Sequence, residues 1–180
     1  MNRCSWCNLK NQKYVDYHDN EWCVLNKDEK YLYEMFILES FQAGLSWECV
    51  LNKRETFLKA YDNFDIDKVV KYDEKKEEEL RNNKDIIRNR LKIQASINNS
   101  KIYMNIVNEF GSFYNYLSSF TGGLTFNEIG KTTSSLSDKI SFDLKKRGMK
   151  FVGSTIIYSY LCAIGIVYAH ETTCFLYKKC

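Results

Sequence analysis

Apolar side chains recur at helical spacing along most of the chain. In residues 27–44, Leu32, Phe36 and Glu39 fall on one face of a helix, and apolar residues occupy most of the other faces as well. A helix that is apolar on most sides is typical of a buried position. Gly44 follows where a glycine commonly ends a helix. The segment therefore predicts a buried helix that carries the carboxylate of Glu39 on an apolar face.

The same spacing predicts further helices. They are expected at residues 47–61 after an N-cap at Ser46, at 73–83, in a longer stretch that carries Ile86, Ile93, Ile97, Met104 and Val107, in a short stretch capped by Ser112, and at 136–148. Residues 82–85 read Asn-Asn-Lys-Asp and predict a tight turn, because Asn tolerates a positive φ. Residues 120–135 predict a loop because Gly and Thr are frequent there.

Residues 154–165 are apolar nearly all round, and their β-branched side chains would also suit a buried strand. The segment lies after a predicted helix, and the sequence offers no second strand to pair with it. We therefore expect a central helix and an all-α protein. The segment is too short to cross a membrane as a helix, which takes about 20 residues.

Length and composition indicate one compact folded unit. The chain has 180 residues, of which 44% are hydrophobic and 27% charged, as in ordinary globular proteins. We expect a single helical domain over residues 1–180, within which two lobes are possible: about 46–130, and 1–45 together with 131–180. No apolar run of membrane-spanning length and no apolar N-terminal segment is present, which predicts no membrane contact and a cytoplasmic protein.

Seven cysteines, an odd number, argue against a disulfide framework in a reducing compartment. Metal ligation or buried thiols are the expected uses. The net charge of +3 permits an acidic partner such as nucleic acid but does not require one.

The only two histidines lie near the two ends of the chain, each close to cysteine. His170 and Cys174 are four residues apart, so one helical turn would point both at the same ion. We expect Cys4 and His18 to lie on a longer loop that folds over that point. Two sulfur and two nitrogen ligands suit tetrahedral Zn²⁺, and four protein ligands indicate a structural site that joins the chain ends.

Two other interpretations of these residues stay open. Cys4 and Cys7 have a zinc-like spacing of their own, so Cys7 is a competing ligand. The cysteines are also explained as ordinary buried thiols beside a surface histidine.

A second group of residues surrounds Glu39. Desolvation on an apolar helix face raises the pKa of a carboxylate unless a donor meets it. Aromatic residues lie nearby in "YHDNEW" and "LESFQAGLSW". A buried carboxylate ringed by Trp and Tyr suits the edge and faces of an extrahelical base. The alternative is a carboxylate satisfied by a backbone donor within an aromatic core.

Two basic clusters are candidates for phosphate contacts. They comprise Arg88, Arg90 and Lys92, and Lys145, Lys146, Arg147 and Lys150. A tight helix-turn-helix presents backbone N–H groups to phosphate at the start of its second helix. Most charge runs, however, are solvated faces.

The order of several motifs resembles the bacterial type I 3-methyladenine DNA glycosylases of the helix-hairpin-helix superfamily. The matching segments are "RCSW" at residues 3–6, "YHDNEW" at 17–22, "LESFQAGLSW" at 38–47, "VLNKRETF" at 50–57, "DIIRNRLKIQA" at 85–95, "LKKRGMKFVGSTIIYSY" at 144–160, and the closing His170-x3-Cys174. The resemblance covers nearly the whole chain.

This resemblance implies a helix-hairpin-helix fold, hydrolytic release of N3-methyladenine from alkylated double-stranded DNA, and a structural zinc bound by Cys4, His18, His170 and Cys174. It further implies the following roles: Glu39 recognises the base edge and is the catalytic candidate, Tyr17 and Trp47 stack on the ring with Trp6 nearby, Trp22 packs behind the pocket, and Gln42, Gly44 and Leu45 belong to a loop that enters the gap left by the flipped nucleotide.

The chain departs from the family pattern at several positions. Lys84-Asp85 and Leu91 stand where glycines are usual in or after the hairpin, and Cys23 follows "NEW" where glycine is usual. Asp85 could cap the following helix, but its charge would oppose a phosphate.

No lysine stands out as a Schiff-base nucleophile, which predicts a monofunctional enzyme that frees 3-methyladenine and leaves an abasic site. We also expect the enzyme to be a monomer. Two other functions remain open: a zinc-stapled DNA-binding protein without activity, and a thiol or metal sensor that uses Cys4 and Cys7.

Overall fold

Helices make up most of the chain in the computed structural model, which describes residues 1–178. The helices are α1 (Gln12–Asn20), α2 (Glu29–Gln42), α3 (Trp47–Leu51), α4 (Arg54–Ala60), α5 (Ile66–Val69), α6 (Glu74–Asn82), α7 (Arg90–Phe110), α8 (Phe113–Thr121), α9 (Ser135–Lys146) and α10 (Ser154–Ala163), with a 3₁₀ turn, η1 (Asp62–Phe64). Two short strands, β1 (Phe126–Asn127) and β2 (Val167–Tyr168), complete the described elements.

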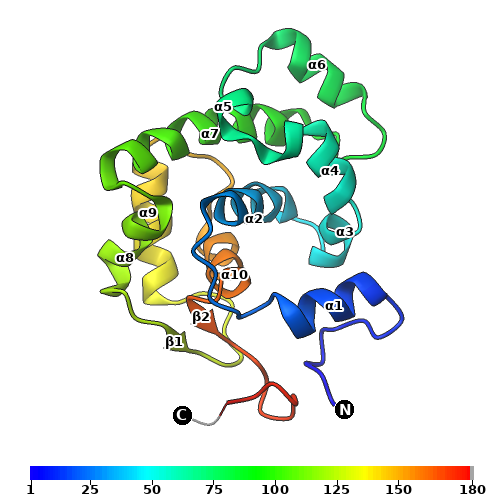
Figure 1. Cartoon of the computed structure of the whole chain (residues 1–180), viewed down its shortest axis with the longest axis vertical. Coiled ribbons are helices and arrows are strands. Elements are labelled where there is room, and N and C mark those ends of the chain that lie inside the picture. The colour runs from blue at the N-terminus through cyan, green and yellow to red at the C-terminus, as the bar shows by residue number, and fades with distance from the viewer. Residues whose placement is uncertain (179–180) are drawn as a thin grey trace.

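Helices α2 and α10 lie in the middle of the molecule (Figure 1). Helix α2 contacts α3, α7, α8 and α10, and nine of its residues are buried. Helix α10 also packs on α9. The prediction of a central helix at residues 154–165 is confirmed. None of the described helices is long and apolar enough to cross a membrane.

Several helix ends follow the capping residues read from the sequence. The Ser46 hydroxyl accepts a hydrogen bond from the backbone N–H of Cys49, and Ser112 accepts one from the backbone N–H of Asn115. Gly44 has a φ of +75° directly after α2. These local signals were sufficient because each cap satisfies backbone groups within its own turn.

The prediction of one continuous helix over residues 47–61 is wrong, because the structure has two helices there, α3 and α4. Asn52 and Lys53 form a turn between α3 and α4. The new direction brings Arg54 to the carboxylates of Glu21 and Glu34, with a 2.7 Å contact to each. Tertiary ion pairing therefore sets this break, and the helical spacing continues through it.

The long helix also begins later than the sequence predicts. Asn89 caps α7 by accepting from the backbone N–H of Lys92, so Ile86 lies before the helix. Where the sequence predicts a tight turn at residues 82–85, the structure has a longer connection over residues 83–89. Ile86 is buried within this connection. Asp85 does not cap α7; its carbonyl accepts from Lys53 Nζ and Thr56 Oγ1.

A parallel strand pair replaces part of the loop predicted at residues 120–135, so the all-α prediction is incomplete. Phe126 pairs with Val167, and Asn127 pairs with Tyr168. Each strand has two residues, which is too short for an alternating pattern to appear in the sequence. The pair fixes the segment that leads into His170.

The turn after α10 is held by a close approach of two backbone segments. Cys23 N–H donates to the Cys162 carbonyl, and Asn26 N–H donates to the Ile164 carbonyl. Gly165 lies at this crossing with a φ of +75°. A Cβ there would lie 2.2 Å from the backbone nitrogen of Leu25.

We predict that Gly165→Ala lowers the free energy of unfolding by roughly 3 kcal/mol or more, because the added carbon meets rigid backbone on a strained φ. Gly122→Ala is the matched control: its φ is +64°, and nothing lies within 4 Å of the added carbon. The control should cost only about 1–2 kcal/mol. Urea unfolding of both variants measures the difference, and equal losses would contradict the prediction.

Candidate functional site

A cavity of about 310 Å³ lies between the N-terminal segment, α2, α3 and α10. All three tryptophans of the chain line it. The lining residues fall into an aromatic side (Trp6, Tyr14, Tyr17, Trp22 and Trp47), two polar residues of α2 (Glu39 and Gln42), and an opposite side from α10 and residues 130–132 (Lys131, Thr132, Thr155, Tyr158 and Ser159). Cys162, Ala169 and Glu171 lie at its border with the C-terminal segment.

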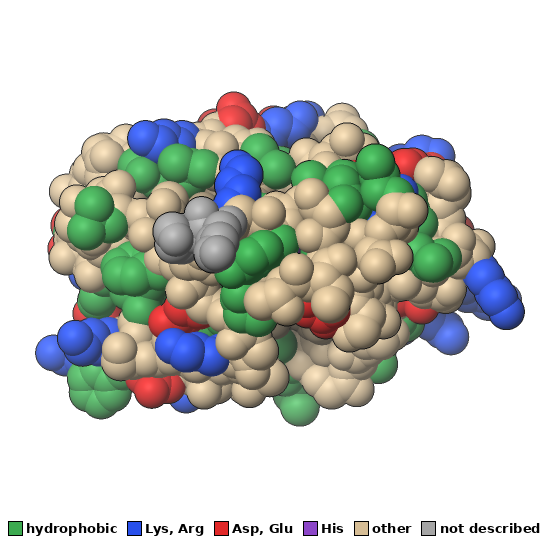
Figure 2. All heavy atoms as spheres, turned by 90° about the horizontal axis from the view of Figure 1, so that it is seen from below, with side chains coloured by type: hydrophobic (Ala, Val, Ile, Leu, Met, Phe, Trp, Pro, Cys, Tyr) green, Lys and Arg blue, Asp and Glu red, His purple; other side chains and the backbone are tan. Residues whose placement is uncertain are grey.

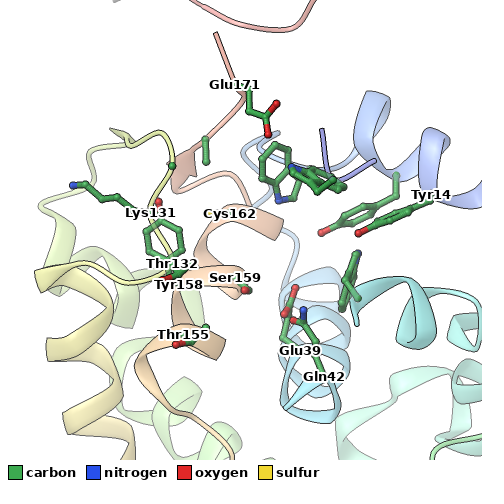
Figure 3. A pocket seen from close by; sticks show the side chains of 16 residues that line it. Tyr14, Glu39, Gln42, Lys131, Thr132, Thr155, Tyr158, Ser159, Cys162 and Glu171 are labelled. Atoms are coloured by element: carbon green, nitrogen blue, oxygen red, sulfur yellow. The ribbon is translucent and has the colours of Figure 1, made fainter. Parts of the chain in front are cut away.

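Glu39 lies in this cavity on α2 and is only 3% exposed. Its Oε2 atom has no hydrogen-bond partner in the described chain, which argues against a carboxylate satisfied by a backbone donor. Burial raises the pKa of Glu39 well above the ordinary value of a glutamate. Figure 3 shows Glu39 and Gln42 pointing from α2 toward the aromatic side.

Two more buried polar atoms in the same cavity lack a partner in the described residues. They are Gln42 Oε1 and Trp47 Nε1. Buried polar atoms without partners are rare in folded proteins, because each costs desolvation free energy. Three of them around one cavity, beside aromatic rings, form a site complementary to a flat molecule with a polar edge.

The aromatic side is arranged as two contacting groups. The Tyr17 and Trp47 ring centroids are 5.3 Å apart, and Trp6 meets Trp22 at 4.6 Å with the rings nearly perpendicular. Trp22 lines the cavity, so the expectation that it packs behind the pocket is wrong. Tyr14 was missed, although it lies one helical turn before Tyr17 and could have been found from that spacing.

The opposite side of the cavity was also missed. Thr155 and Ser159 present hydroxyl groups from successive turns of α10, and Tyr158 comes from the same helix (Figure 3). Small hydroxyl residues in an apolar helix carry no distinctive sequence signal. Their role emerges only when α10 packs beside α2.

The three residues expected in the inserting loop separate into two environments. Gln42 lines the cavity, whereas Gly44 and Leu45 are exposed. Leu45 is 40% exposed, and its backbone N–H donates to the Gln42 carbonyl at 2.7 Å. The apolar side chain of Leu45 is therefore held at the surface, three residues after Gln42 in the sequence.

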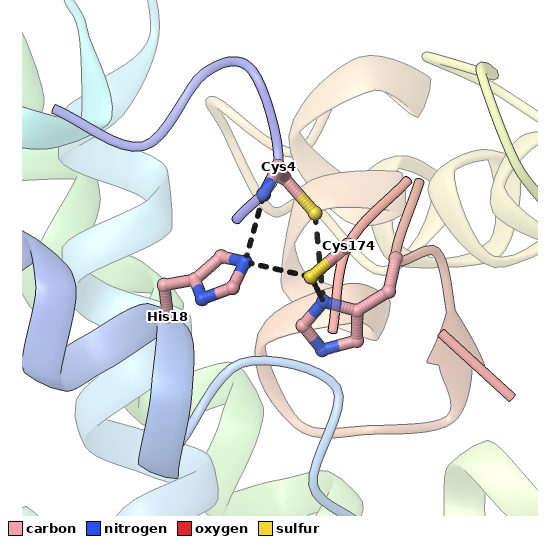
Figure 4. A group of neighbouring side chains, drawn as sticks. Cys4, His18 and Cys174 are labelled. Carbon is pink, nitrogen blue, oxygen red and sulfur yellow. Dashed lines mark hydrogen bonds between the residues drawn. The ribbon is translucent and has the colours of Figure 1, made fainter. Parts of the chain in front are cut away.

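A second site joins the chain ends, where the four predicted ligands meet. The ligand atoms of Cys4, His18, His170 and Cys174 all lie within 4.8 Å of one another, and all four residues are buried (Figure 4). Cys174 Sγ lies 3.5 Å from both His18 Nε2 and His170 Nδ1. Sulfur and nitrogen ligands of a tetrahedral zinc are about 3.5–3.6 Å apart, so the donor set fits a metal of this kind.

The local structures around these ligands differ from the predictions. His18 lies on α1 and not on a loop. His170 and Cys174 lie in a turn outside any helix, in which the Cys174 backbone N–H donates to the Glu171 carbonyl. Cys7 is not in the group, because its thiol lies against the Tyr14 carbonyl at 3.9 Å. The structure therefore groups the other four residues without Cys7, and their binding of a metal stays a prediction.

Further contacts orient the ligands. His18 Nδ1 lies 2.7 Å from Asp19 Oδ1, and Arg3 donates to both oxygens of Asp19. The Arg3 hydrogen bonds hold the pKa of Asp19 below its usual value. A carboxylate behind a ligating histidine is a common feature of metal sites.

Burial also favours the neutral forms of two residues in this cluster. Burial raises the pKa of the Cys4 thiol to about 12 and lowers the pKa of His170 to about 4, so both groups are neutral when no cation is bound. A divalent cation would favour the thiolates. His18 and His170 are 0% and 1% exposed, and Figure 2 shows no histidine on the face it presents.

The basic clusters are less available than the sequence indicated. Arg147 pairs with Glu109 and Asp143, with contacts of 2.6 and 2.8 Å. Lys92 is buried, whereas Arg88 and Arg90 are exposed beside the 83–89 connection. Phosphate contact by this connection remains a prediction.

Cys23, at a position where the sequence resemblance leads us to expect glycine, has a φ of +64°. This left-handed conformation favours glycine. The thiol is buried and accepts a hydrogen bond from the Ala169 backbone N–H at 3.2 Å. Burial and this contact offset part of the conformational strain.

Comparison with known proteins shows the family of this chain. The family described as methyladenine glycosylase matches residues 6–177. "DNA-3-methyladenine glycosylase 1" of Escherichia coli is 44% identical over 98% of this chain and 97% of its own length. The chain belongs to the methyladenine glycosylase family. A second relative, "DNA-3-methyladenine glycosylase" of Haemophilus influenzae, is 34% identical over 96% of each chain.

Solved structures of the family have the same fold. A crystal structure of 3-methyladenine DNA glycosylase I has a TM-score of 0.93, with 39% identity, and the match covers 98% of this chain and 100% of that one. A variant of 3-methyladenine DNA glycosylase I in complex with 3-methyladenine has a TM-score of 0.91 at 31% identity, covering 97% of each chain.

The raised pKa of Glu39 predicts a pH-dependent stability. The folded chain binds this proton more tightly than the unfolded chain, so the free energy of unfolding falls as the pH rises above the ordinary carboxyl range. Glu39→Gln removes this titration. The stability of the variant relative to the wild type should therefore grow between about pH 5 and about pH 8.

Urea unfolding at the two pH values measures this change. Glu55→Gln is the control, because Glu55 is exposed and its pKa is lowered by Lys13. A difference between Glu39→Gln and wild type that stays constant with pH would refute the raised pKa.

Proposed function

We propose that this protein is a monofunctional DNA-repair glycosylase that flips N3-methyladenine out of alkylated DNA and hydrolyses its glycosidic bond. The observation that carries the proposal is the convergence of three unpartnered polar atoms with contacting aromatic rings in one cavity. Relatives named for 3-methyladenine, and a family structure that holds this base, support it. Extrahelical bases are read in the same way, by their polar edge and their faces.

Recognition follows from the cavity residues. Glu39 would hydrogen-bond the edge of the base, and Tyr17 and Trp47 would stack on its ring, with Trp6 nearby. Methylation at N3 makes the nucleotide base cationic. A buried Glu39 without a cationic partner in the described chain is well suited to receive such a base, because the incoming charge favours the ionised carboxylate.

The chemistry needs little acid catalysis. The methylated base leaves as a neutral purine, the sugar passes through an oxocarbenium-like state, and water attacks C1′. Glu39 contributes by holding the base and through its negative charge. Lys131 lines the cavity, but its ammonium pairs with Glu128 at 3.0 Å, which disfavours a Schiff-base role.

Entry into DNA would use the exposed Gly44–Leu45 turn. Leu45 would fill the gap left by the flipped nucleotide, with Gln42 at the border of the cavity. The α6–α7 connection would act as the hairpin of a helix-hairpin-helix fold, with Arg88 and Arg90 facing the phosphates. The exposure of both arginines supports this assignment.

We also propose that Cys4, His18, His170 and Cys174 hold one structural Zn²⁺. The ion would neutralise the two thiolates and join the chain ends. It would also position the cavity, because Tyr17 is adjacent to His18 and Glu171 is adjacent to His170, and both line the cavity. We further propose that the enzyme acts as a monomer in the cytoplasm.

Base release tests the main proposal. Purified protein should free 3-methyladenine from alkylated duplex DNA, and Glu39→Ala and Glu39→Gln should each slow release roughly 10- to 100-fold, the loss expected for a hydrogen bond to a charged group. Chromatography of the released bases measures the rate.

Glu55→Gln, a change of the same kind outside the cavity, should leave release unaltered. Lesion-independent DNA binding without any release would instead favour a non-catalytic DNA-binding protein. Undiminished release by both Glu39 variants would remove this residue from the proposal.

Metal analysis tests the zinc site. Elemental analysis should give about one zinc per chain, and Cys174→Ser should lower both the zinc content and the melting temperature, the latter by about 5 °C or more. Cys7→Ser is the matched control, because Cys7 is a buried thiol of the same N-terminal segment that lies outside the four-residue group. Equal zinc loss in both variants would contradict the assignment.

A further inference from the structure

Lys92 is a buried lysine whose ammonium group binds backbone carbonyls. The residue is 7% exposed. Its Nζ donates to the Phe41 carbonyl at 2.8 Å and to the Ala43 carbonyl at 2.5 Å. The Phe151 ring lies beneath the same nitrogen, with its centroid 6.0 Å away. Lys92 therefore joins the start of α7 to the end of α2.

This arrangement is costly for a lysine. No carboxylate pairs with the ammonium in the described part of the chain, and burial lowers its pKa. The side chain also belongs to the first turn of α7, where the helix dipole disfavours a cation. The compensating interaction is with α2, whose last turn contains no basic residue of its own. The Lys92 ammonium thus interacts favourably with the C-terminal end of the α2 dipole and not with the dipole of its own helix.

The carbonyls that Lys92 binds lead directly into the exposed turn. Phe41 and Ala43 accept from Lys92, and Gln42 between them accepts from the Leu45 N–H. All three terminal carbonyls of this stretch are therefore paired. Gly44 follows with a φ of +75° and has nothing within 4 Å of its side-chain position, so local packing alone does not hold the turn.

We propose that Lys92 is a positioning residue that fixes the Gly44–Leu45 turn for entry into duplex DNA. This inference rests on the proposed function. Glu39 lies earlier in α2, where regular helix bonds and packing hold it. Gln42 lies within the stretch that Lys92 holds, whereas Glu39, Tyr17 and Trp47 do not. The role of Lys92 therefore concerns the opening of the duplex more than recognition of the free base.

The position of Lys92 adds a second consequence. Arg88 and Arg90 are exposed just before it on the 83–89 connection and α7. Binding of a phosphate there would act on the same rigid segment that holds the turn after α2. Lys92 thus links the proposed backbone contact to the residue that enters the base stack.

The test compares three variants on two measurements. Lys92→Met removes the ammonium and keeps the apolar stem, Lys92→Arg restores a cation, and Lys101→Met is the control for loss of an exposed positive charge on the same helix. The measurements are kcat/KM for base release from alkylated duplex DNA and the Kd for free 3-methyladenine by calorimetry.

Lys92→Met should lower kcat/KM on duplex DNA roughly tenfold or more, while the Kd for the free base changes by less than about threefold. Lys92→Arg should recover part of the rate, and Lys101→Met should behave as wild type. Ile106→Val, a small change in the buried face of α7, controls for general destabilisation and should leave the rate on duplex DNA near that of the wild type.

Parallel losses in kcat/KM and in free-base affinity would overturn the inference, because they indicate a merely structural lysine. Unchanged release by Lys92→Met would also overturn it. These outcomes leave the proposed function intact. A wild-type protein that releases no base would refute the proposed function and this role of Lys92 together.

Discussion

The burial of α2 is the constraint on which the rest of the structure depends. Its apolar residues pack against helices on several sides, so the helix has no freedom to tilt or slide. The same packing takes Glu39 out of water without giving it a partner. A free carboxylate in this position is stable only because many apolar contacts offset its desolvation. The apolar contacts of the hydrophobic core therefore offset the free-energy cost of burying Glu39 in the cavity.

The two chain ends solve a complementary problem. The segment before α1 supplies Trp6 to the aromatic side of the cavity, and the segment after β2 supplies Ala169 and Glu171 to its lining. The cluster of Cys4, His18, His170 and Cys174 gives these segments a common centre. Ion pairing of Arg3 with Asp19 and the β1–β2 pairing reinforce it from either side. Polar interactions and the buried Cys and His side chains thus connect the two chain ends.

Sequence periodicity was sufficient to predict helices that are apolar on most sides, such as α2 and α10. Residue type was sufficient to predict the serine caps, because their hydrogen bonds are local. Residue chemistry was sufficient to select Glu39 as a buried carboxylate and to predict that Cys4, His18, His170 and Cys174 come together. It was not sufficient for features set by tertiary contacts. The break before Arg54 depends on distant carboxylates, the two-residue strands depend on each other, and Thr155 gains its place in the cavity only when α10 packs beside α2. Helix α1 was missed because most of its residues are polar.

The placement of the tryptophans has a consequence for how this molecule can be observed. Because all three line one cavity, the tryptophan fluorescence of the protein originates there. A change in emission therefore reports the environment of a single site and not an average over the fold. Helices α6 to α9 contain no tryptophan and do not contribute to this tryptophan emission. The protein carries its own optical probe, and that probe lies where a ligand would bind.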